Sequence, residues 1–208
     1  MSAMISATTR ASLAIAALLA LAGLQMGCAP VLVVGAATYG GTLLHERRTG
    51  ETVLADETIE WRAQALLWQL PEPLRQARAR VISYNQVALL VGQAPNPAIA
   101  QALAARIAAL PQVRRVYNEM TVGPPLGVAQ ISTDTYLGTR AKLALAAIQL
   151  PDFDPLRVKI VVEAGTVYLL GLVTPAEAEA SIAKIRHVPE VQRVVSLFEY
   201  VVPPAAAS

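Results

Sequence analysis

One cysteine carries the clearest chemical signal in this chain. Cys28 follows Leu24-Gln25-Met26-Gly27, so a small residue directly precedes the thiol. This spacing resembles a lipobox, in which the cysteine is acylated and becomes the first residue of the mature chain. Gln25 stands where the pattern prefers leucine, which leaves open an idle or buried cysteine behind a cleaved signal or an inner-membrane anchor. We expect lipidation of Cys28.

The other reactive side chains offer little for catalysis or metal binding. A single cysteine excludes an internal disulfide and a cysteine-based zinc cluster. His45 and His187 are too few for a histidine metal site, and Asp152 with Asp154 falls far short of a calcium-binding loop. No serine has a nucleophile-elbow context, and no glycine-rich phosphate loop follows a strand. The sequence predicts no enzyme, no cofactor and no metal.

The charge balance restricts the class of partner. The chain has 17 basic and 15 acidic residues and a net charge of +2. A nucleic-acid binder needs a concentrated basic surface, which this sequence lacks. We therefore expect no nucleic-acid partner.

Apolar residues are concentrated near the N-terminus, where they must position Cys28. No charged residue occurs from Ala11 to Leu44, and Arg10 precedes this run. Its first part, residues 11–24, is shorter than the roughly 20 residues that a membrane helix needs. A short apolar core behind a basic residue is typical of a signal peptide. We predict a signal peptide over residues 1–27 and a lipidated N-terminus with a flexible tether over residues 28–52.

The remainder of the chain is an internal repeat with copies at residues 53–122 and 132–201. Each copy has an apolar helical stretch, two short β-like runs, a helix that starts at a proline and a final valine-spaced strand. The order αββαβ predicts an α+β fold in which two helices cover a three-stranded sheet. The turn-prone residues 123–131 are expected to be a linker, and residues 202–208 a disordered tail.

Local signals support these elements. Ala164-Gly165 is typical of a hairpin turn. Thr174, Pro175 and Glu177 predict a helix N-terminus with a capping box, for which Asn96-Pro97 is the weaker counterpart. The predicted core stripes of the helices in the first copy are Ile59, Ala63, Leu66 and Leu70, and Ile99, Leu103, Ile107 and Leu110.

Four short motifs, two in each copy, together carry a more specific signal. They are Leu89-Leu90-Val91-Gly92-Gln93, Val116-Tyr117-Asn118-Glu119, Asp134-Thr135-Tyr136 and Gly171-Leu172-Val173-Thr174. With them the chain resembles the dual BON-domain outer-membrane lipoproteins, the DolP (YraP) family. The resemblance implies tandem BON domains, anchored by lipid on the periplasmic face of the outer membrane. We expect Gly92 and Gly171 to lie at strand-to-loop turns.

The same resemblance implies binding to anionic phospholipid through the first helix of the second copy, and support of envelope integrity. We place this helix at residues 135–150. Its candidate contact residues are Tyr136, Arg140, Lys142, Leu143 and Ala147, because they lie away from the predicted core face and combine apolar, aromatic and basic side chains. Packing of this second face against the other copy is the structural alternative. The functional alternative is an adaptor that binds an outer-membrane assembly or cell-wall remodelling protein.

Trp61 and Trp68 lie on the side of their helix opposite the predicted core face. Two linked small domains need a mutual contact, so we expect both indoles to form the interface between the copies. A second membrane-contact surface in the first copy is the alternative.

Overall fold

The computed structural model describes residues 46–201. The predicted signal peptide, Cys28, most of the tether and the C-terminal tail lie outside this range. The described residues belong to one compact unit that contains both copies of the repeat.

The first copy contains two α-helices and a small mixed sheet. Its elements are α3 (Gly50–Trp68), the 3-10 turn η1 (Leu74–Gln76), β1 (Arg78–Tyr84), β2 (Val87–Ala94), α4 (Pro97–Ala108), β3 (Arg115–Asn118) and β4 (Thr121–Val122). β1 runs antiparallel to the central strand β2, and β3 and the short β4 pair parallel to β2. The expected sheet of this copy is thus extended by one two-residue strand.

The second copy repeats this order. Its elements are α5 (Val128–Ala146), the 3-10 turn η2 (Pro155–Arg157), β5 (Val158–Glu163), β6 (Thr166–Val173), α6 (Pro175–Arg186) and β7 (Arg193–Tyr200). β5 is antiparallel and β7 parallel to the central strand β6. The predicted tandem αββαβ fold of the α+β class is confirmed.

The predicted turns and caps form as their residue types require. Ala164 and Gly165 both have positive φ between β5 and β6, which matches the twist of a tight hairpin. The Thr174 hydroxyl accepts from the Glu177 amide, and the Glu177 side chain accepts from the Thr174 amide, so α6 has the predicted capping box. The Asn96 side chain caps α4 by accepting from the Ile99 amide at 3.0 Å.

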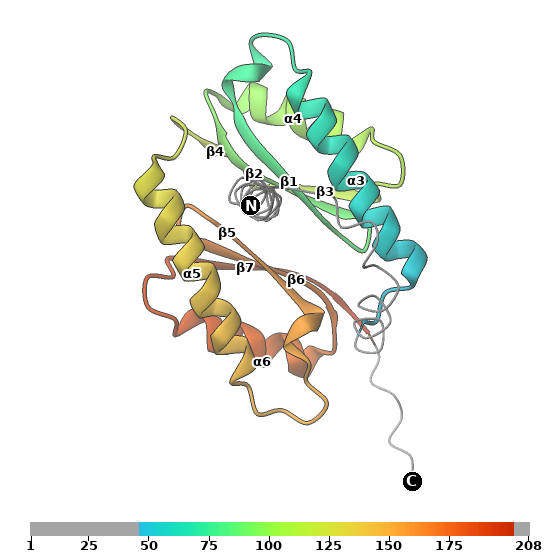
Figure 1. Ribbon diagram of the computed structural model, residues 1–208, viewed down its shortest axis with the longest axis vertical. Helices are drawn as coiled ribbons and strands as arrows, with labels where there is room; N and C mark the ends of the chain where they lie inside the picture. Colours follow the sequence, from blue (N-terminus) through green and yellow to red (C-terminus); the bar gives the residue numbers. More distant parts are fainter. Residues whose placement is uncertain (1–45, 202–208) are drawn as a thin grey trace, which may run out of the picture. The chain divides into compact units, whose positions relative to one another are not determined.

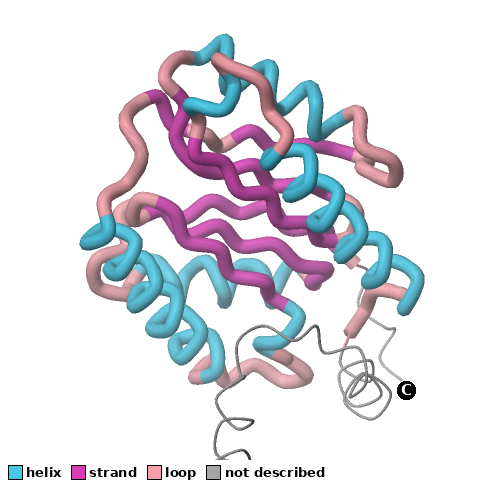
Figure 2. Tube along the Cα trace, turned by 45° about the horizontal axis from the view of Figure 1, so that its top comes forward, coloured by secondary structure: helices cyan, strands magenta, loops and turns pink. Residues whose placement is uncertain are grey.

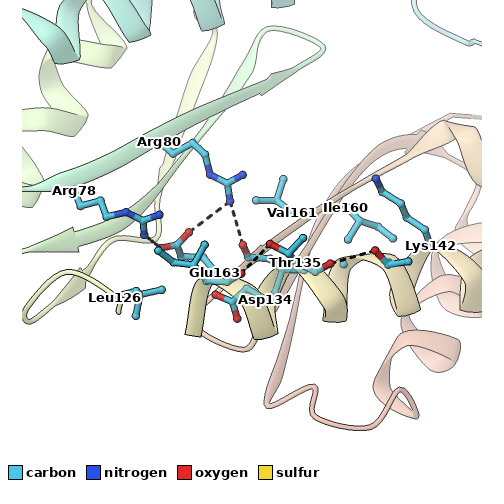
Figure 3. A pocket seen from close by; sticks show the side chains of 13 residues that line it. Arg78, Arg80, Leu126, Asp134, Thr135, Lys142, Ile160, Val161 and Glu163 are labelled. Carbon is cyan, nitrogen blue, oxygen red and sulfur yellow. Dashed lines mark hydrogen bonds and ion pairs between the residues drawn. The ribbon is translucent and has the colours of Figure 1, made fainter. Parts of the chain in front are cut away.

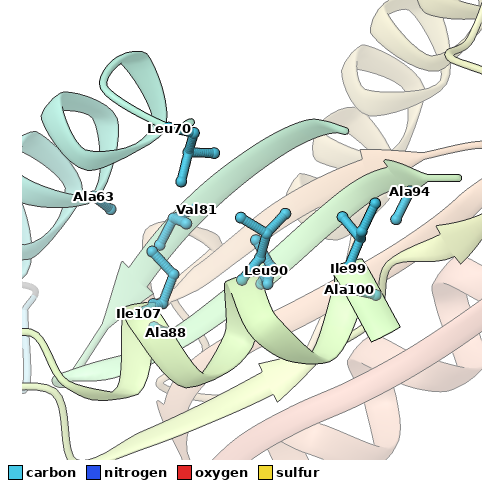
Figure 4. Close-up of a cluster of buried hydrophobic side chains, with 10 residues drawn as sticks. Ala63, Leu70, Val81, Ala88, Leu90, Ala94, Ile99, Ala100 and Ile107 are labelled. Carbon is cyan, nitrogen blue, oxygen red and sulfur yellow. The ribbon is translucent and has the colours of Figure 1, made fainter. Parts of the chain in front are cut away.

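Each copy has its own apolar core between its helices and the outer face of its sheet. In the first copy, the core includes Ala63 of α3, Leu90 of β2 and Leu103 and Ile107 of α4, all fully buried. Figure 4 shows how α4 presents Ile99, Ala100 and Ile107 to the strands. The matching core of the second copy includes Leu137, Leu169 and Ile185.

A third apolar cluster joins the inner faces of the two sheets. It contains Ile82, Tyr84, Leu89 and Val91 from the first copy and Val161, Tyr168 and Leu170 from the second. Figures 1 and 2 show the helices on the outside and the two sheets facing each other between them. The central strands are therefore buried on both faces, which explains why β2 and β6 are almost continuously apolar.

The prediction that Trp61 and Trp68 form the interface between the copies was wrong. Their side chains are 71% and 73% exposed on the outside of α3. The sheets supply the interface, because each helix covers only the outer face of its own sheet. The inner faces of the sheets are apolar and become buried by packing against each other.

The position of the two motif glycines also differs from the expectation. Gly92 lies within β2 and Gly171 within β6, not at strand ends. A Cβ at Gly92 would lie 1.9 Å from the Arg78 carbonyl oxygen, and one at Gly171 would lie 2.6 Å from that of Arg157. Each glycine therefore allows close approach of the chain beside its central strand.

The first helix of each copy begins earlier than predicted. α3 starts at Gly50, within the expected tether, and is capped by Thr49. α5 starts at Val128, so the last four residues of the expected linker are helical. α5 ends at Ala146, which makes Ala147 its C-cap residue.

Candidate functional site

A buried carboxylate fixes α5 against its sheet. Asp134 accepts hydrogen bonds from the backbone amides of Ala164 and Gly165 at 2.8 and 2.9 Å. These amides form the hairpin turn between β5 and β6, so the contact joins the second turn of the helix to the end of the strand pair. Leu137 and Ala141 follow on the same buried face. The opposite face of α5 is thereby directed to solvent.

This solvent-facing side carries four of the five predicted contact residues. Tyr136 is 56% exposed and Leu143 is 67% exposed, while Ala147 is exposed and Arg140 is half-buried. The Arg140 guanidinium carbon lies 5.6 Å from the centre of the Tyr136 ring, within range of a cation–π contact. The described part of the first copy does not bury this stripe, so the packing alternative is wrong. Aromatic, aliphatic and cationic groups thus form one exposed stripe.

Lys142, the fifth predicted residue, lies on a different side of α5. It lines a groove of about 350 Å³ between α5 and β5 of the second copy and β1 of the first. Figure 3 shows Lys142 at one end of the groove and Arg78 and Arg80 at the other, with Thr135 along the helix between them. The structure therefore separates Lys142 from Tyr136 but places it with two arginines of the other copy.

Glu163 organises the charges at the arginine end of the groove. This residue, only 7% exposed, accepts from Arg78 at 3.3 Å, from Arg80 at 3.5 Å and from the Gln93 amide at 2.9 Å. The Arg80 guanidinium also donates to the Val162 carbonyl at 3.1 Å. Side chains of Arg78 and Arg80 remain 42% and 54% exposed, so both retain N–H groups that face solvent.

The contribution of Arg78 and Arg80 was missed by sequence reasoning. The two arginines are two positions apart in β1, so they project from the same face of the strand. This spacing is visible in the sequence, but the sequence does not show which elements pack against that face. Only the packing of sheet on sheet brings β1 beside α5 and β5.

Two other features are not found among the described residues. Between residues 46 and 201, no helix is both long and apolar enough to cross a bilayer. The same residues contain no group of three or more histidine, cysteine, aspartate or glutamate side chains arranged to hold a metal ion. Cys28, the predicted lipidation site, lies outside the described residues.

Comparison with known proteins identifies the repeat. The family model described as BON domain matches residues 58–124 and 134–201, one match for each copy. The outer membrane lipoprotein DolP of Haemophilus influenzae is 32% identical over 177 residues, which cover 84% of this chain and 89% of that protein. This chain belongs to the DolP family of two-BON-domain proteins. The 21 kDa hemolysin of Actinobacillus pleuropneumoniae is 33% identical over 154 residues, covering 74% of this chain and 78% of that protein.

Similarity to solved structures is much weaker. CdsD, a structural protein of the type III secretion system of Chlamydia trachomatis, matches 72% of this BON-domain chain and 92% of its own chain. The identity is 11% and the TM-score 0.28, values too low to support a conclusion about the fold or function. The assignment to the DolP family therefore depends on the family model and the sequence relatives.

Proposed function

We propose that this protein is a non-enzymatic outer membrane lipoprotein that binds anionic phospholipid and supports envelope integrity. Acylated Cys28 anchors it on the periplasmic face, and the second BON domain contacts the bilayer through α5. The relative named as an outer membrane lipoprotein supports the location. The observation that carries the lipid-binding part is the exposed stripe of Tyr136, Arg140 and Leu143 beside a cation-lined groove.

The chemistry of the stripe suits the boundary between lipid and water. Tyrosine has an apolar ring and a polar hydroxyl. Transfer of a leucine side chain out of water lowers the free energy of the system. Arg140 lies beside the Tyr136 ring, where it can meet a phosphate as the ring enters the interface. Insertion of the two apolar side chains and one charge-assisted contact therefore reinforce one another.

Headgroup attraction must be local because the second copy has no basic excess. Residues 132–201 contain seven Lys and Arg and eight Asp and Glu. The groove concentrates cations despite this balance, because Arg78 and Arg80 of the first copy lie opposite Lys142. Of its two carboxylates, Asp134 is bound to two backbone amides and Glu163 is shared by both arginines, so the lining keeps a small positive excess centred on Lys142. Each basic residue near an anionic surface contributes about 1 kcal/mol to binding.

Vesicle flotation tests this proposal with residues 42–208, which contain all three apolar clusters but no lipid anchor. We expect binding to phosphatidylglycerol vesicles in preference to phosphatidylcholine vesicles. The variant Tyr136→Ser with Leu143→Ser should lower the binding constant about tenfold or more, because two inserted apolar side chains are lost. Arg140→Gln should reduce mainly the preference for phosphatidylglycerol.

The matched control is Leu156→Ser, which removes a leucine that is 71% exposed in η2, outside the stripe. Its binding should equal that of the unchanged protein. Equal binding to both lipids, or an unchanged response in the Tyr136 and Leu143 variant, would reject the lipid function.

A deletion strain tests the link to envelope integrity. The link is supported if the Tyr136 and Leu143 variant, present at normal abundance, fails to restore detergent resistance. The adaptor function would be favoured if the deletion strain were instead fully restored.

Anchoring requires a separate test. Incorporation of radiolabelled fatty acid into the full-length protein should be present in the unchanged chain and absent in Cys28→Ala. Incorporation that persists in Cys28→Ala would show that the anchor is elsewhere.

A further inference from the structure

A second exposed apolar stripe lies on α3 of the first BON domain. Leu54, Trp61 and Trp68 are 60%, 71% and 73% exposed. They are seven residues apart, which is 20° short of two full helical turns, so all three lie along one side of the helix. The stripe extends over about 21 Å at a rise of 1.5 Å per residue. Nothing in residues 46–201 covers it.

A groove between α3 and α4 lies next to this stripe. It has a volume of about 440 Å³ and is lined by Leu66 and Leu70 from the α3 side and Leu110 from the α4 side, with Ala65 at the edge towards the tryptophans. Apolar side chains therefore continue from the exposed indoles into a concave surface. An acyl chain or the glycerol region of a lipid fits a surface of this chemistry.

Two arginines border the groove. Arg62 of α3 and Arg106 of α4 line it, and both are exposed. Neither has a hydrogen bond or ion pair within residues 46–201. Between Trp61 and Trp68 the helix has no acidic residue, and α4 has none at all. The exposed acids Glu51 and Glu57 lie in the N-terminal half of α3. Glu60, beside Trp61, is paired with Lys159 at 2.7 Å, and the exposed Glu72 lies beyond the end of α3. The helix from Trp61 to Trp68 and the groove thus combine cations with apolar surface.

We propose that this surface of the first BON domain is a second membrane-contact site, which takes the headgroup and interfacial region of an anionic phospholipid bilayer. Trp61 and Trp68 enter the interface, where indole rings with one polar N–H are favoured. Arg62 and Arg106 contact phosphate groups beside them. The site is separate from the α5 stripe and uses residues from different positions of the repeat. Asp56 of α3 accepts from the Asn85 and Gln86 turn amides, as Asp134 of α5 does from those of Ala164 and Gly165. Aligning these two aspartates places Trp61 at the position of Thr139, not of Tyr136.

The chain length makes even a weak contact of this kind effective. Gly50, the first residue of α3, lies only 22 positions after Cys28. Fully extended, 22 steps span at most roughly 75 Å, so an acylated Cys28 keeps α3 near the bilayer at high effective concentration. This step rests on the proposed lipid anchor, whereas the surface itself does not depend on α5.

Native fluorescence can test the site, since Trp61 and Trp68 are the only two tryptophans in the whole chain. The full-length acylated protein is reconstituted into phosphatidylcholine vesicles with or without phosphatidylglycerol, and with brominated lipid as a quencher. We expect a blue shift and quenching by brominated lipid in the phosphatidylglycerol vesicles. Both effects should persist in the variant Tyr136→Ser with Leu143→Ser.

The control moves the reporter to another helix. In Trp61→Phe with Trp68→Phe and Ala183→Trp, the single tryptophan lies at an exposed position of α6, and brominated lipid should leave it unquenched. Arg62→Gln with Arg106→Gln should remove most of the dependence on phosphatidylglycerol, about fivefold for each arginine. Arg186→Gln, an exposed arginine of α6, should have no effect.

Three results would overturn this inference. The first is emission that stays unshifted and unquenched in phosphatidylglycerol vesicles. The second is a blue shift without lipid quenching that increases with protein density, which would assign the stripe to a second copy of the chain. The third is loss of quenching in the α5 variant. The proposed function would then stand, but α3 would have no membrane contact independent of α5. Conversely, the tryptophans could be quenched by brominated lipid while the α5 substitutions leave vesicle flotation unchanged. That combination would reject the α5 proposal alone.

Discussion

At the scale of single residues, two glycines are required by the close approach of a neighbouring chain segment. Gly92 has a φ of +128°, a backbone conformation that side chains disfavour, and the Arg78 carbonyl occupies the place of its missing Cβ. The physical requirement is therefore local and does not involve a ligand. This distinguishes the motif glycines of the repeat from the exposed residues of the proposed membrane-contact surfaces.

Gly92→Ala should destabilise the protein by about 2–4 kcal/mol, because the new methyl group displaces a strand and the backbone is strained. Gly138→Ala is the matched control. There a Cβ would meet only Val162 Cγ2 at 3.7 Å, so helix propensity should stabilise α5 by up to about 1 kcal/mol. Urea unfolding followed by circular dichroism measures both changes. Equal effects of the two substitutions would contradict the steric explanation.

Glu177 links stability to pH. Burial opposes ionisation of its carboxyl group, but hydrogen bonds from the Arg47 guanidinium and the Thr174 amide outweigh burial and lower its pKa below the ordinary value of 4.5. A carboxyl group with a lowered pKa stabilises the fold above its unfolded-state pKa, and this contribution is lost as pH falls through the folded-state value.

Thermal unfolding between pH 5 and pH 3 should therefore show a fall in Tm to which Glu177 contributes. Glu177→Gln should cost about 1–3 kcal/mol at pH 7, where hydrogen bonds to a charged group are lost, and should make the fall shallower. Glu179→Gln, at an exposed position of the same helix, should do neither. A Tm profile for Glu177→Gln parallel to that of the unchanged protein would disprove the assignment.

At the scale of elements, each copy uses a buried aspartate to join its first helix to its hairpin. Asp134 accepts from the two turn amides of the second copy, and Asp56 accepts from the Asn85 and Gln86 amides, both at 2.7 Å. The repeat thus preserves one polar contact that sets the position of the helix along the strand pair.

Asp134→Ala should destabilise the protein by about 2–4 kcal/mol, since one buried and one partly buried amide lose their partner. It should also weaken vesicle binding, because α5 no longer holds its stripe in a fixed orientation. Hydrogen exchange at Ala164 and Gly165 reports the loss directly. Asp152→Ala, an exposed loop residue, provides the control and should leave exchange at both amides unchanged.

Features that depend on residues close together in the sequence could be predicted, whereas those that depend on distant residues could not. The capping box at Thr174, the turn at Ala164-Gly165 and the core stripe through Ile59 are local patterns, and all were predicted correctly. The buried role of Asp134 depends on a hairpin 30 residues away, so the residue was placed at the helix start instead. The groove of Arg78 and Lys142 was missed because it forms only when the copies pack together.

At the scale of the whole described unit, the decisive contact is between two sheets. The continuous apolar runs of β2 and β6 already carried this information, because a strand covered on one face only would alternate with polar residues. Two linked domains do make a mutual contact, as expected, but the inner faces of the sheets supply it and the tryptophans do not. The exposed indoles are instead available for an external partner.

Leu170→Ala tests the coupling of the two BON domains. Leu170 is 1% exposed in the cluster between the sheets, and its truncation leaves the separate core of each domain intact. We expect a loss of about 2–5 kcal/mol, and a single calorimetric transition that broadens or separates into two. Leu156→Ala, at an exposed leucine, should change stability by less than about 0.5 kcal/mol. An unaltered single transition in Leu170→Ala would mean that the sheet interface contributes little.

The segment that enters the fold before α3 is attached to both domains. Arg47 forms a two-pronged ion pair with Glu177 of the second domain at 2.6 and 3.0 Å. In the first domain, the Arg48 guanidinium donates to the Asp56 carboxylate at 2.7 Å, and its central carbon lies 3.8 Å from the centre of the Tyr84 ring. A mechanical pull along the N-terminal segment therefore reaches both domains together at residues 47 and 48. The load is shared across their junction before it can peel the first turn of α3 away from its sheet.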